Sequence, residues 1–380
     1  MSLPEAVVTI KTAVVVAQKG LVERESLVEA IVLAAVAGEH VLVIGPPGTA
    51  KSEAARRVAR ALGGRTFEYL LGRFTEPNEI FGPVDLRRLR EGVVEVETAG
   101  MLPEAEIGFL DEVFLGSTAI LNTLLGVLNE RVFRRGSTVR KVPLRVCVGA
   151  SNALPDDESL AAFADRFLLR SFVEPVGDPF LETLLEEGWG VQGPPPEPVP
   201  GAMAALDTLS AAVRQVDLGA VRPSLAHAVR LLRKAGVVVP DRRIVRVQKL
   251  VAAATVLDGR LLASGADLWP IIYAVPTREG QAVAREALSE LLKNARNEAL
   301  SAAAAEASGG PLARALRVTE AGEAVLAARP PADDAVLMDG WRRRVEGVAR
   351  EIDAAFVRET LPDALKAVRD RVAGVLAEAG

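Results

Sequence analysis

The sequence contains 380 residues, with 45 basic and 50 acidic side chains and a formal net charge of −5. This acidic balance argues against a general nucleic-acid-binding protein, which would carry a basic excess. Cys147 is the only cysteine, so intramolecular disulfides and cysteine zinc sites are excluded, and His40 and His227 alone are too few for a histidine-rich metal centre.

Neither the start of the chain nor any later apolar run indicates a membrane protein. Residues 1–20 lack a basic region followed by a long apolar core, and no uncharged apolar run has the length of a membrane span. The length is sufficient for two or three domains with a sizeable core. We therefore expect a soluble, cytoplasmic protein.

The first predicted elements are a helix, a buried strand and a second helix. Residues 20–37 repeat apolar side chains at helical spacing, with Ser26 as a cap or early-turn residue and Gly38 as the stop. Residues 40–45 are a short apolar run that ends in glycine, which predicts a buried strand. Residues 53–63 predict a helix with apolar side chains on one side and arginines on the other.

The octet GPPGTAKS lies between this strand and this helix, and it departs from the phosphate-binding pattern G-x-x-x-x-G-K-[ST] only at Ala50. Alanine is a strong helix former and costs nothing at the helix entrance if its φ is negative. Lys51 can then reach the β- and γ-phosphates, and the Ser52 hydroxyl can bind Mg²⁺. The alternative is a Gly/Pro-rich turn with a surface lysine. The candidate nucleotide-binding residues here are Gly45, Pro46, Gly48, Thr49, Ala50, Lys51 and Ser52.

A second candidate group follows the apolar run of residues 107–114, which carries the adjacent acids Asp111 and Glu112. Two acids at the end of a buried strand are costly unless a ligand uses them. Asp111 can hold the hydration shell of Mg²⁺, and Glu112 can polarise an attacking water, a role typically worth ~10²–10⁴ in rate. The alternative is a strand that ends in an acidic turn.

Residues 143–152 predict a third strand, which ends at Asn152. An uncharged amide there can hold a water near the γ-phosphate, although a strand-end asparagine is often only a turn residue. Residues 161–175 predict a helix end that runs into a strand. Arg166 and Arg170 lie in this segment, and either can reach the γ-phosphate of a neighbouring subunit as an arginine finger. An ordinary salt bridge is the alternative for each.

The rest of the chain is predicted to be helical after a Pro/Gly-rich connector. Asp241 is the expected N-cap of a helix over residues 240–257. The tail is rich in Ala, Glu, Arg and Leu and predicts three or four amphipathic helices, either packed on the lid or presented to a partner. The expected divisions are an α/β nucleotide-binding core (1–186), a connector (187–201), a helical lid (202–275) and a C-terminal helical region (276–380).

Taken together, these motifs resemble the MoxR family of AAA+ ATPases, specifically its RavA-like branch. The stretches that carry the resemblance span roughly residues 20–275. They are GPPGTAKS (45–52), FEYLLGRFTEPNEIFGPV (67–84), LPEAEIGFLDEVF (102–114), AILNTLLGVLNERVF (119–133), ASNALP (150–155), ADRFLLR (164–170) and PDRR (240–243). The resemblance implies a five-stranded parallel α/β core and a smaller helical lid with ATP between them, in a hexamer whose sites are completed by the next subunit.

The resemblance also assigns roles to residues. It makes Lys51, Ser52, Asp111, Glu112 and Asn152 the Walker A, Walker B and first-sensor residues. Arg166 is the better match for the finger, with Arg170 as its rival. Arg242, which can swing toward the γ-phosphate, matches the second sensor in the lid, with Arg243 as its rival. Leu21 and Val22 match the segment that contacts adenine, although an apolar pair before a helix can also be core.

Two further stretches resemble the insertions that mark this clade. Residues 84–102 have the alternation and Glu-Gly turn of a hairpin between short helices, and residues 128–146 predict a hairpin that turns at Arg-Gly-Ser. In related motors such hairpins touch the substrate, while the alternative is a pair of solvated charged hairpins. The second carries a basic cluster, for which we favour a protein partner over nucleic acid because the chain is acidic and no aromatic residue lies within the run 134–141. The cluster consists of Arg134, Arg135, Arg140 and Lys141.

The leading functional hypothesis is an ATP hydrolase that uses Mg²⁺ and remodels or matures a protein partner, as MoxR-like chaperones do, often with a von Willebrand A domain partner. A nucleotide-dependent assembly scaffold with little turnover is a second hypothesis. A nucleic-acid motor is a third and less favoured one, since replicative helicases share the hairpin insertions. The client and the role of the tail are not encoded in any motif that we recognise.

Overall fold

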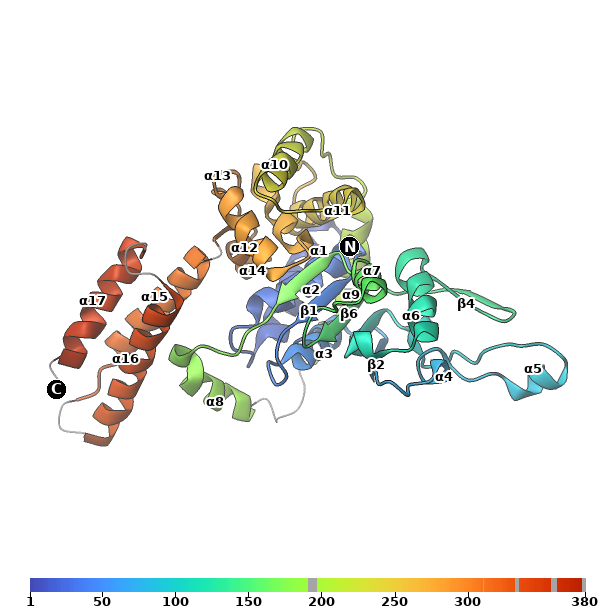
Figure 1. Ribbon diagram of the computed structural model, residues 1–380, viewed down its shortest axis with the longest axis horizontal. Coiled ribbons are helices and arrows are strands. Elements are labelled where there is room, and N and C mark those ends of the chain that lie inside the picture. The colour runs from blue at the N-terminus through green and yellow to red at the C-terminus, as the bar shows by residue number, and fades with distance from the viewer. Residues whose placement is uncertain (191–196, 310, 332–334, 357–360, 378–380) are drawn as a thin grey trace.

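A computed structural model describes residues 1–190, 197–309, 311–331, 335–356 and 361–377. Its centre is a five-stranded sheet in the order β2-β3-β6-β1-β7, in which every neighbouring pair is parallel (Figure 1). The strands are β1 (Val41–Ile44), β2 (Thr66–Leu70), β3 (Ile107–Asp111), β6 (Val146–Ser151) and β7 (Leu169–Phe172). The predicted parallel α/β core is therefore confirmed.

Both faces of this sheet are covered, which explains why its three inner strands, β3, β6 and β1, are buried runs without alternation. In β1, Val41 and Val43 join the apolar cluster on one face, while Leu42 and Ile44 join the cluster on the other. The first face is covered by α1 (Leu3–Gln18), α2 (Glu25–Ala37) and α3 (Lys51–Leu62), and the second by α6 (Thr118–Leu125) and α7 (Glu158–Ala164).

Helix α2 begins later than predicted. Arg24 is its N-cap, and Ser26 lies in the first turn without capping it. Gly38 ends the helix in the left-handed conformation, with φ of 66°, as a C-terminal glycine commonly does. Residues 20–24 are thus a loop that leads into α2, and they border the site described below.

The first insertion differs from the prediction. Residues 86–90 form a short helix, α5, rather than the strand of a hairpin, and a single bridge joins Val84 to Val96. The reason is local: the Asp85 carboxylate accepts hydrogen bonds from the backbone N–H groups of Arg87 and Arg88, which caps a helix at this point.

The second insertion is the predicted hairpin. Strands β4 (Val132–Arg135) and β5 (Thr138–Lys141) pair in antiparallel register around Gly136, whose φ is 60°. In Figure 1, this hairpin and α5 project from the same side of the core. The remaining elements of this region are α4 (Pro77–Phe81), the short 3₁₀ segments at Leu102–Glu104 and Val113–Leu115, and a π-helical turn at Gly126–Glu130.

The predicted connector begins inside a helix. Its residues 187–190 belong to α8 (Leu181–Gly190), and its residues 191–196 lie outside the described part of the chain. The lid follows with α9 (Ala202–Val213), α10 (Arg222–Lys234), α11 (Asp241–Leu257) and 3₁₀ segments at Gly265–Asp267 and Trp269–Ala274. Pro240, not Asp241, is the N-cap of α11, and the Asp241 carboxylate pairs with Arg233 instead.

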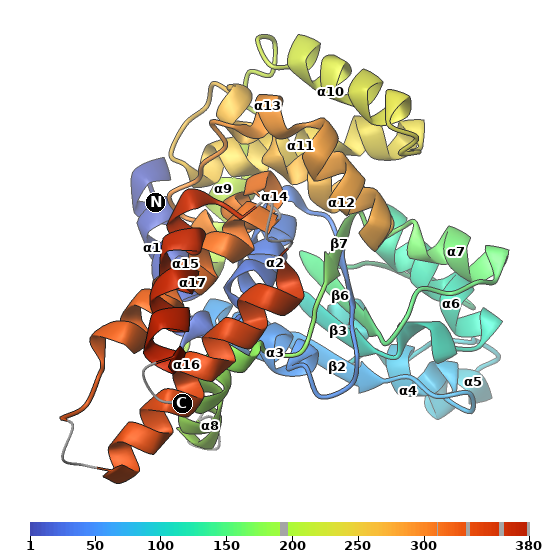
Figure 2. The same ribbon diagram turned by 60° about the vertical axis from the view of Figure 1, so that its left-hand side comes forward.

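The C-terminal region divides in two. Helices α12 (Arg278–Ala287), α13 (Ser289–Leu292) and α14 (Ser301–Gly309) share the apolar cluster of the core and lid. Helices α15 (Pro311–Ala327), α16 (Ala335–Ala355) and α17 (Asp363–Ala377) have a cluster of their own and lie side by side (Figure 2). We expected this bundle to pack on the lid, but α16 packs on the 3₁₀ segment Asp178–Phe180 that follows β7.

Within the described residues, no helix combines the length and apolar character required to cross a membrane.

Candidate nucleotide-binding site

The octet of residues 45–52 connects the carboxyl end of β1 to the start of α3. A Cβ at Gly45 would lie 2.3 Å from the Val173 carbonyl oxygen, so no larger residue fits there. Gly48 has a φ of 80°, which glycine adopts without steric cost. The loop is therefore shaped by backbone constraints at the two positions where the sequence has glycine, and it ends at a helix N-terminus, where phosphate groups bind.

Ala50 is the N-cap of α3 and has a φ of 58°, in the left-handed region. The prediction that alanine costs nothing here required a negative φ, so that prediction is wrong. An L-residue in this conformation costs about 1–2 kcal/mol because its Cβ approaches the following carbonyl group. Glycine, which the usual pattern has at this position, would avoid this strain. The loop keeps its left-handed conformation here even though the residue is alanine.

We expect Ala50→Gly to stabilise the protein by about 0.5–1 kcal/mol, since the relief of left-handed strain exceeds the added entropy of glycine in the unfolded chain. The urea midpoint measures this. A matched control is Ala226→Gly on the exposed side of α10, where the same exchange should destabilise by about 1 kcal/mol. Equal losses at both positions would contradict the strain at Ala50.

Lys51 lies buried across the mouth of the loop. Its Nζ donates to the carbonyl oxygens of Gly45 at 2.5 Å and Pro46 at 2.8 Å, and to Oδ1 of Asn152 at 3.4 Å. Burial lowers the pKa of this ammonium group, against the opposing effect of Asp111 and Glu112. The cation is thus held at the place where an incoming phosphate would exchange for its carbonyl contacts.

Ser52 and Asp111 come together from distant parts of the sequence. The Ser52 hydroxyl donates to Oδ2 of Asp111 at 3.1 Å. A hydroxyl and a carboxylate beside a phosphate-binding loop are the oxygen ligands that suit Mg²⁺, directly or through water. These two residues fit the predicted metal site, and they would hold the ion against the terminal phosphates.

Asn152 connects the lysine to the second acid. Its Nδ2 donates to Oε1 of Glu112 at 2.6 Å, while its Oδ1 accepts from Lys51. Glu112 itself has a φ of 48°, a strained conformation of the kind that occurs at active sites. Lys51, Asn152 and Glu112 therefore form one polar chain at the carboxyl edge of the sheet.

Leu21 and Val22 line neither cavity beside the phosphate loop. Leu21 belongs to the apolar core, and the residues of this loop that line a cavity are Glu23 and Arg24. A space of about 330 Å³ beside Gly45 and Asn152 and one of about 370 Å³ beside Arg24 share the wall of residues 172–175, and together we call them the nucleotide groove. The second space is also lined by Phe356, at the end of α16.

Two arginines at this groove were missed by the sequence analysis. Arg24 is buried, and it donates to the carbonyl oxygens of Thr49 at 2.8 Å and Glu174 at 2.6 Å, so it ties the phosphate loop to the end of β7. Arg278, at the start of α12, forms an ion pair with Glu174 and lines both spaces of the groove. No motif identified either residue, because their partners are backbone carbonyls or a distant carboxylate.

Arg166 lies at the opposite edge of the sheet. The phosphate loop follows β1, and Arg166 precedes β7, which pairs with β1 in parallel register. Strands of this length separate the two edges by roughly 13 Å or more. Arg166 therefore faces away from the groove of its own chain, as a residue that acts on a neighbour would.

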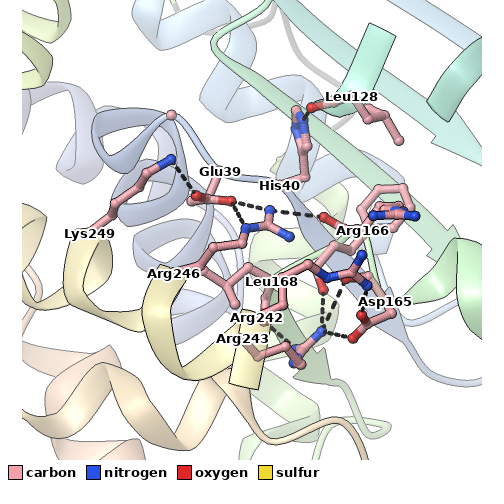
Figure 3. Close-up of polar contacts among 12 residues, drawn as sticks. Glu39, His40, Leu128, Asp165, Arg166, Leu168, Arg242, Arg243, Arg246 and Lys249 are labelled. Carbon is pink, nitrogen blue, oxygen red and sulfur yellow. Dashed lines mark hydrogen bonds and ion pairs between the residues drawn. The ribbon is translucent and has the colours of Figure 1, made fainter. Parts of the chain in front are cut away.

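Arg242 lies beside Arg166 rather than at the nucleotide groove. It forms an ion pair with Asp165, and its side chain remains 46% exposed (Figure 3). Burial works to raise the pKa of Asp165, but the pairs with Arg242 and Arg243 outweigh burial and hold that pKa below its ordinary value. The expectation that Arg242 swings toward a γ-phosphate in its own chain is therefore not supported by its position.

The two rival arginines are structural. Arg243 is fully buried and donates to the carbonyl oxygens of Phe167, Leu168 and Ala274 and to Asp165, which fastens α11 to the start of β7 (Figure 3). Arg170 is buried within β7, where burial lowers its pKa to about 9. Neither guanidinium can reach another subunit without unpacking the core.

The basic cluster of the hairpin is partly neutralised. Arg134 pairs with Glu130, and Arg140 pairs with Glu104. Lys141 is exposed at the end of β5. The hairpin is thus less basic than its sequence, which weakens the argument for a nucleic-acid surface there.

Comparison with known proteins identifies the family to which the chain is similar. Residues 8–210 match the family described as the MoxR domain in the MoxR-vWA-beta-propeller ternary systems. The chain is 35% identical over 252 residues to an uncharacterized protein of Methanocaldococcus jannaschii, covering 65% of each chain. It is 29% identical over 169 residues to the chaperone MoxR1 of Mycobacterium tuberculosis, covering 43% of each. The chain thus spans less than two thirds of the length of these curated relatives.

The fold is also similar to a crystal structure described as a putative ATPase from Cytophaga hutchinsonii. The TM-score is 0.61 at 14% sequence identity, and the match covers 78% of this chain and 96% of the other. At this identity the likeness concerns the fold alone.

Proposed function

The chain belongs to the MoxR family of AAA+ proteins, and on that premise we propose that it hydrolyses ATP with Mg²⁺ in order to remodel or mature a protein partner. The observation that carries the proposal is the meeting of three separate segments at one edge of the sheet. The Ser52 hydroxyl contacts Asp111, and Asn152 bridges Lys51 and Glu112. No structural need of the fold brings a lysine, two acids and an amide to one place.

Each residue then has a task that its contacts support. Lys51 exchanges its carbonyl partners for phosphate oxygens, and Arg24 keeps Thr49 and the loop in position while it does so. Glu112 orients and deprotonates the attacking water, with Asn152 fixing the direction of its carboxylate. Ser52 and Asp111 would hold Mg²⁺, and the bound ion would supply positive charge against the phosphates.

We further propose that Arg166 and Arg242 complete the site of the adjacent subunit in a homo-hexamer. Both lie at the amino edge of the sheet, remote from the phosphate loop of their own chain. A head-to-tail ring brings the carboxyl edge of one subunit to the amino edge of the next, which is the arrangement that such a residue requires.

The partner that we propose is a protein with a von Willebrand A domain, on the strength of the ternary systems in which the matching MoxR domain occurs. The likeness to the chaperone MoxR1 supports remodelling as the outcome of hydrolysis. Membership of the RavA-like branch, which the motifs suggest, remains part of this proposal. The polar chain from Lys51 to Glu112 favours turnover over a purely assembling scaffold, since a scaffold has no use for Glu112.

Lys51→Ala tests the nucleotide site directly. Loss of charge-assisted hydrogen bonds to phosphate should weaken ATP binding by about tenfold to a hundredfold in titration calorimetry. Lys234→Ala, an exposed lysine on α10, is the matched control and should bind like the wild type. Unchanged affinity in Lys51→Ala would refute the phosphate-loop assignment.

A further inference from the structure

A second cavity, of about 720 Å³, lies at the amino edge of the sheet and shares no residue with the nucleotide groove. Its walls come from the ends of α2 and α9, the turn before β4, the loop before β6 and the first half of α11. Glu39 is the one acidic residue among its described lining residues. The basic residues of this cavity, which we call the basic cavity, are Arg131, Lys141, Arg145, Arg214, Arg242, Arg246 and Lys249.

The charges of the basic cavity are not balanced within the chain. Glu39 is almost fully buried and pairs with both Arg246 and Lys249, as Figure 3 shows. Arg145 pairs with Asp207 at 2.6 Å, and Arg242 with Asp165. The carboxylates that neutralise basic residues of the cavity are therefore Glu39, Asp207 and Asp165, all from the described chain.

Arg131, Lys141 and Arg214 form no ion pair within 4.0 Å with an acidic residue of the described chain. Among the described residues, the Arg131 guanidinium makes polar contacts with His40 and with the carbonyl oxygens of Leu128 and Gly38, and Glu39 acts on it only at longer range. Burial lowers its pKa to about 10, so it keeps its charge at neutral pH. The cavity therefore retains a positive excess.

His40 does not compensate for these cations. It is fully buried, its Nδ1 accepts from the backbone N–H of Cys147 at 2.9 Å, and its Nε2 lies 3.0 Å from the Leu128 carbonyl oxygen. Burial and then the charge of Arg131 hold the pKa of His40 well below its usual range. Two further wall atoms, Nε of Arg145 and Oγ of Ser210, have no hydrogen-bond partner in the described structure. The cavity wall thus combines excess positive charge with unpaired hydrogen-bonding groups, a combination that suits an anion from outside the described chain.

We propose that the basic cavity binds a small ligand that carries several phosphate groups. Its volume lies within the range of small-molecule sites, about 300–1,000 Å³. Guanidinium groups from separate segments converge on it, and their planar fork matches phosphate oxygens. An extended protein segment spreads its carboxylates along its length, at about 3.3 Å per residue, whereas linked phosphates concentrate several charges within one cavity.

Inorganic tripolyphosphate is a direct probe, titrated calorimetrically into the full chain with Lys51→Ala to disable the phosphate loop. We expect one site per chain. Adding Arg214→Gln with Lys141→Gln should weaken binding by about tenfold or more, because two charge-assisted contacts are lost. The matched control adds Arg230→Gln with Lys234→Gln on the exposed side of α10 and should change affinity less than about twofold.

Three outcomes would overturn the proposal. The first is equal tripolyphosphate affinity in the cavity variant and its control, and the second is loss of binding in Arg166→Ala but not in the cavity variant. The third is a glutamate oligopeptide of equal charge that binds more tightly than tripolyphosphate. The second would assign the anion to the ring-facing arginines, and the third would assign the cavity to an acidic protein segment. The titration needs no hydrolysis, so it can succeed even if the protein turns over no ATP, and it can fail while the proposed ATPase function stands.

Discussion

Glu112→Gln should lower ATP turnover by about 10²–10⁴-fold while leaving ATP binding close to that of the wild type. The amide keeps the shape of the side chain and can still meet Asn152, whose Nδ2 lies 2.6 Å from Oε1 of Glu112. It cannot take a proton from the attacking water. Steady-state phosphate release measures turnover, and calorimetry measures binding.

The matched control is Glu290→Gln, an exposed glutamate on α13 that lines neither space of the nucleotide groove, and it should change neither quantity. A wild-type protein that turns over no faster than Glu112→Gln would leave the remodelling proposal without its energy source. The variant held in ATP is also a trap, because partners that leave on hydrolysis should remain bound in a pull-down.

The residues of the nucleotide groove differ in how far the sequence could predict them. Lys51, Ser52 and Asp111 occur at the ends of apolar runs, and parallel strands bring such ends to one edge of a sheet. Their meeting follows from topology and needs no detail of packing. Arg24 bonds to carbonyl oxygens of Thr49 and Glu174, and nothing in a one-dimensional pattern specifies which carbonyls will be near.

The errors in the fold have local causes. The alternation of residues 84–102 suggests a strand after Asp85. However, the Asp85 carboxylate accepts hydrogen bonds from the backbone N–H groups of Arg87 and Arg88, and this cap stabilises a helical turn. At Ala50 the pattern gave the residue but not its φ, which depends on the path that the loop must take from β1 into α3. In both cases a backbone conformation, rather than a side-chain preference, determined the outcome.

The position of the lid could not be predicted from any motif. Arg242 and Arg243 are adjacent in sequence and matched the same role, yet one is half exposed and the other fully buried. The difference arises because Arg243 donates to the carbonyl oxygens of Phe167 and Leu168, which are fixed beside α11 only once β7 has joined the sheet. That contact sets α11 against the amino edge and carries Arg242 there with it.

Arg166→Ala should lower ATP turnover by about 10³–10⁵-fold, because the loss removes a positive charge from the transition state of the adjacent site. ATP affinity should change little, since Arg166 lies across the sheet from the phosphate loop of its own chain. On its own this result would not separate an effect within the chain from one between subunits. A mixture of inactive variants makes that separation.

Lys51→Ala subunits keep Arg166, and Arg166→Ala subunits keep the phosphate loop. If the finger acts between subunits of a head-to-tail ring, mixing the two inactive proteins in equal amounts should restore about a quarter of wild-type turnover, since a quarter of randomly formed interfaces would combine an intact loop with an intact finger. Mixing Lys51→Ala with Glu112→Gln should restore none, because both defects then lie on the same side of every interface. No recovery in the first mixture would place Arg166 outside the adjacent site, whereas recovery in the second would show that Lys51 and Glu112 do not act from the same subunit.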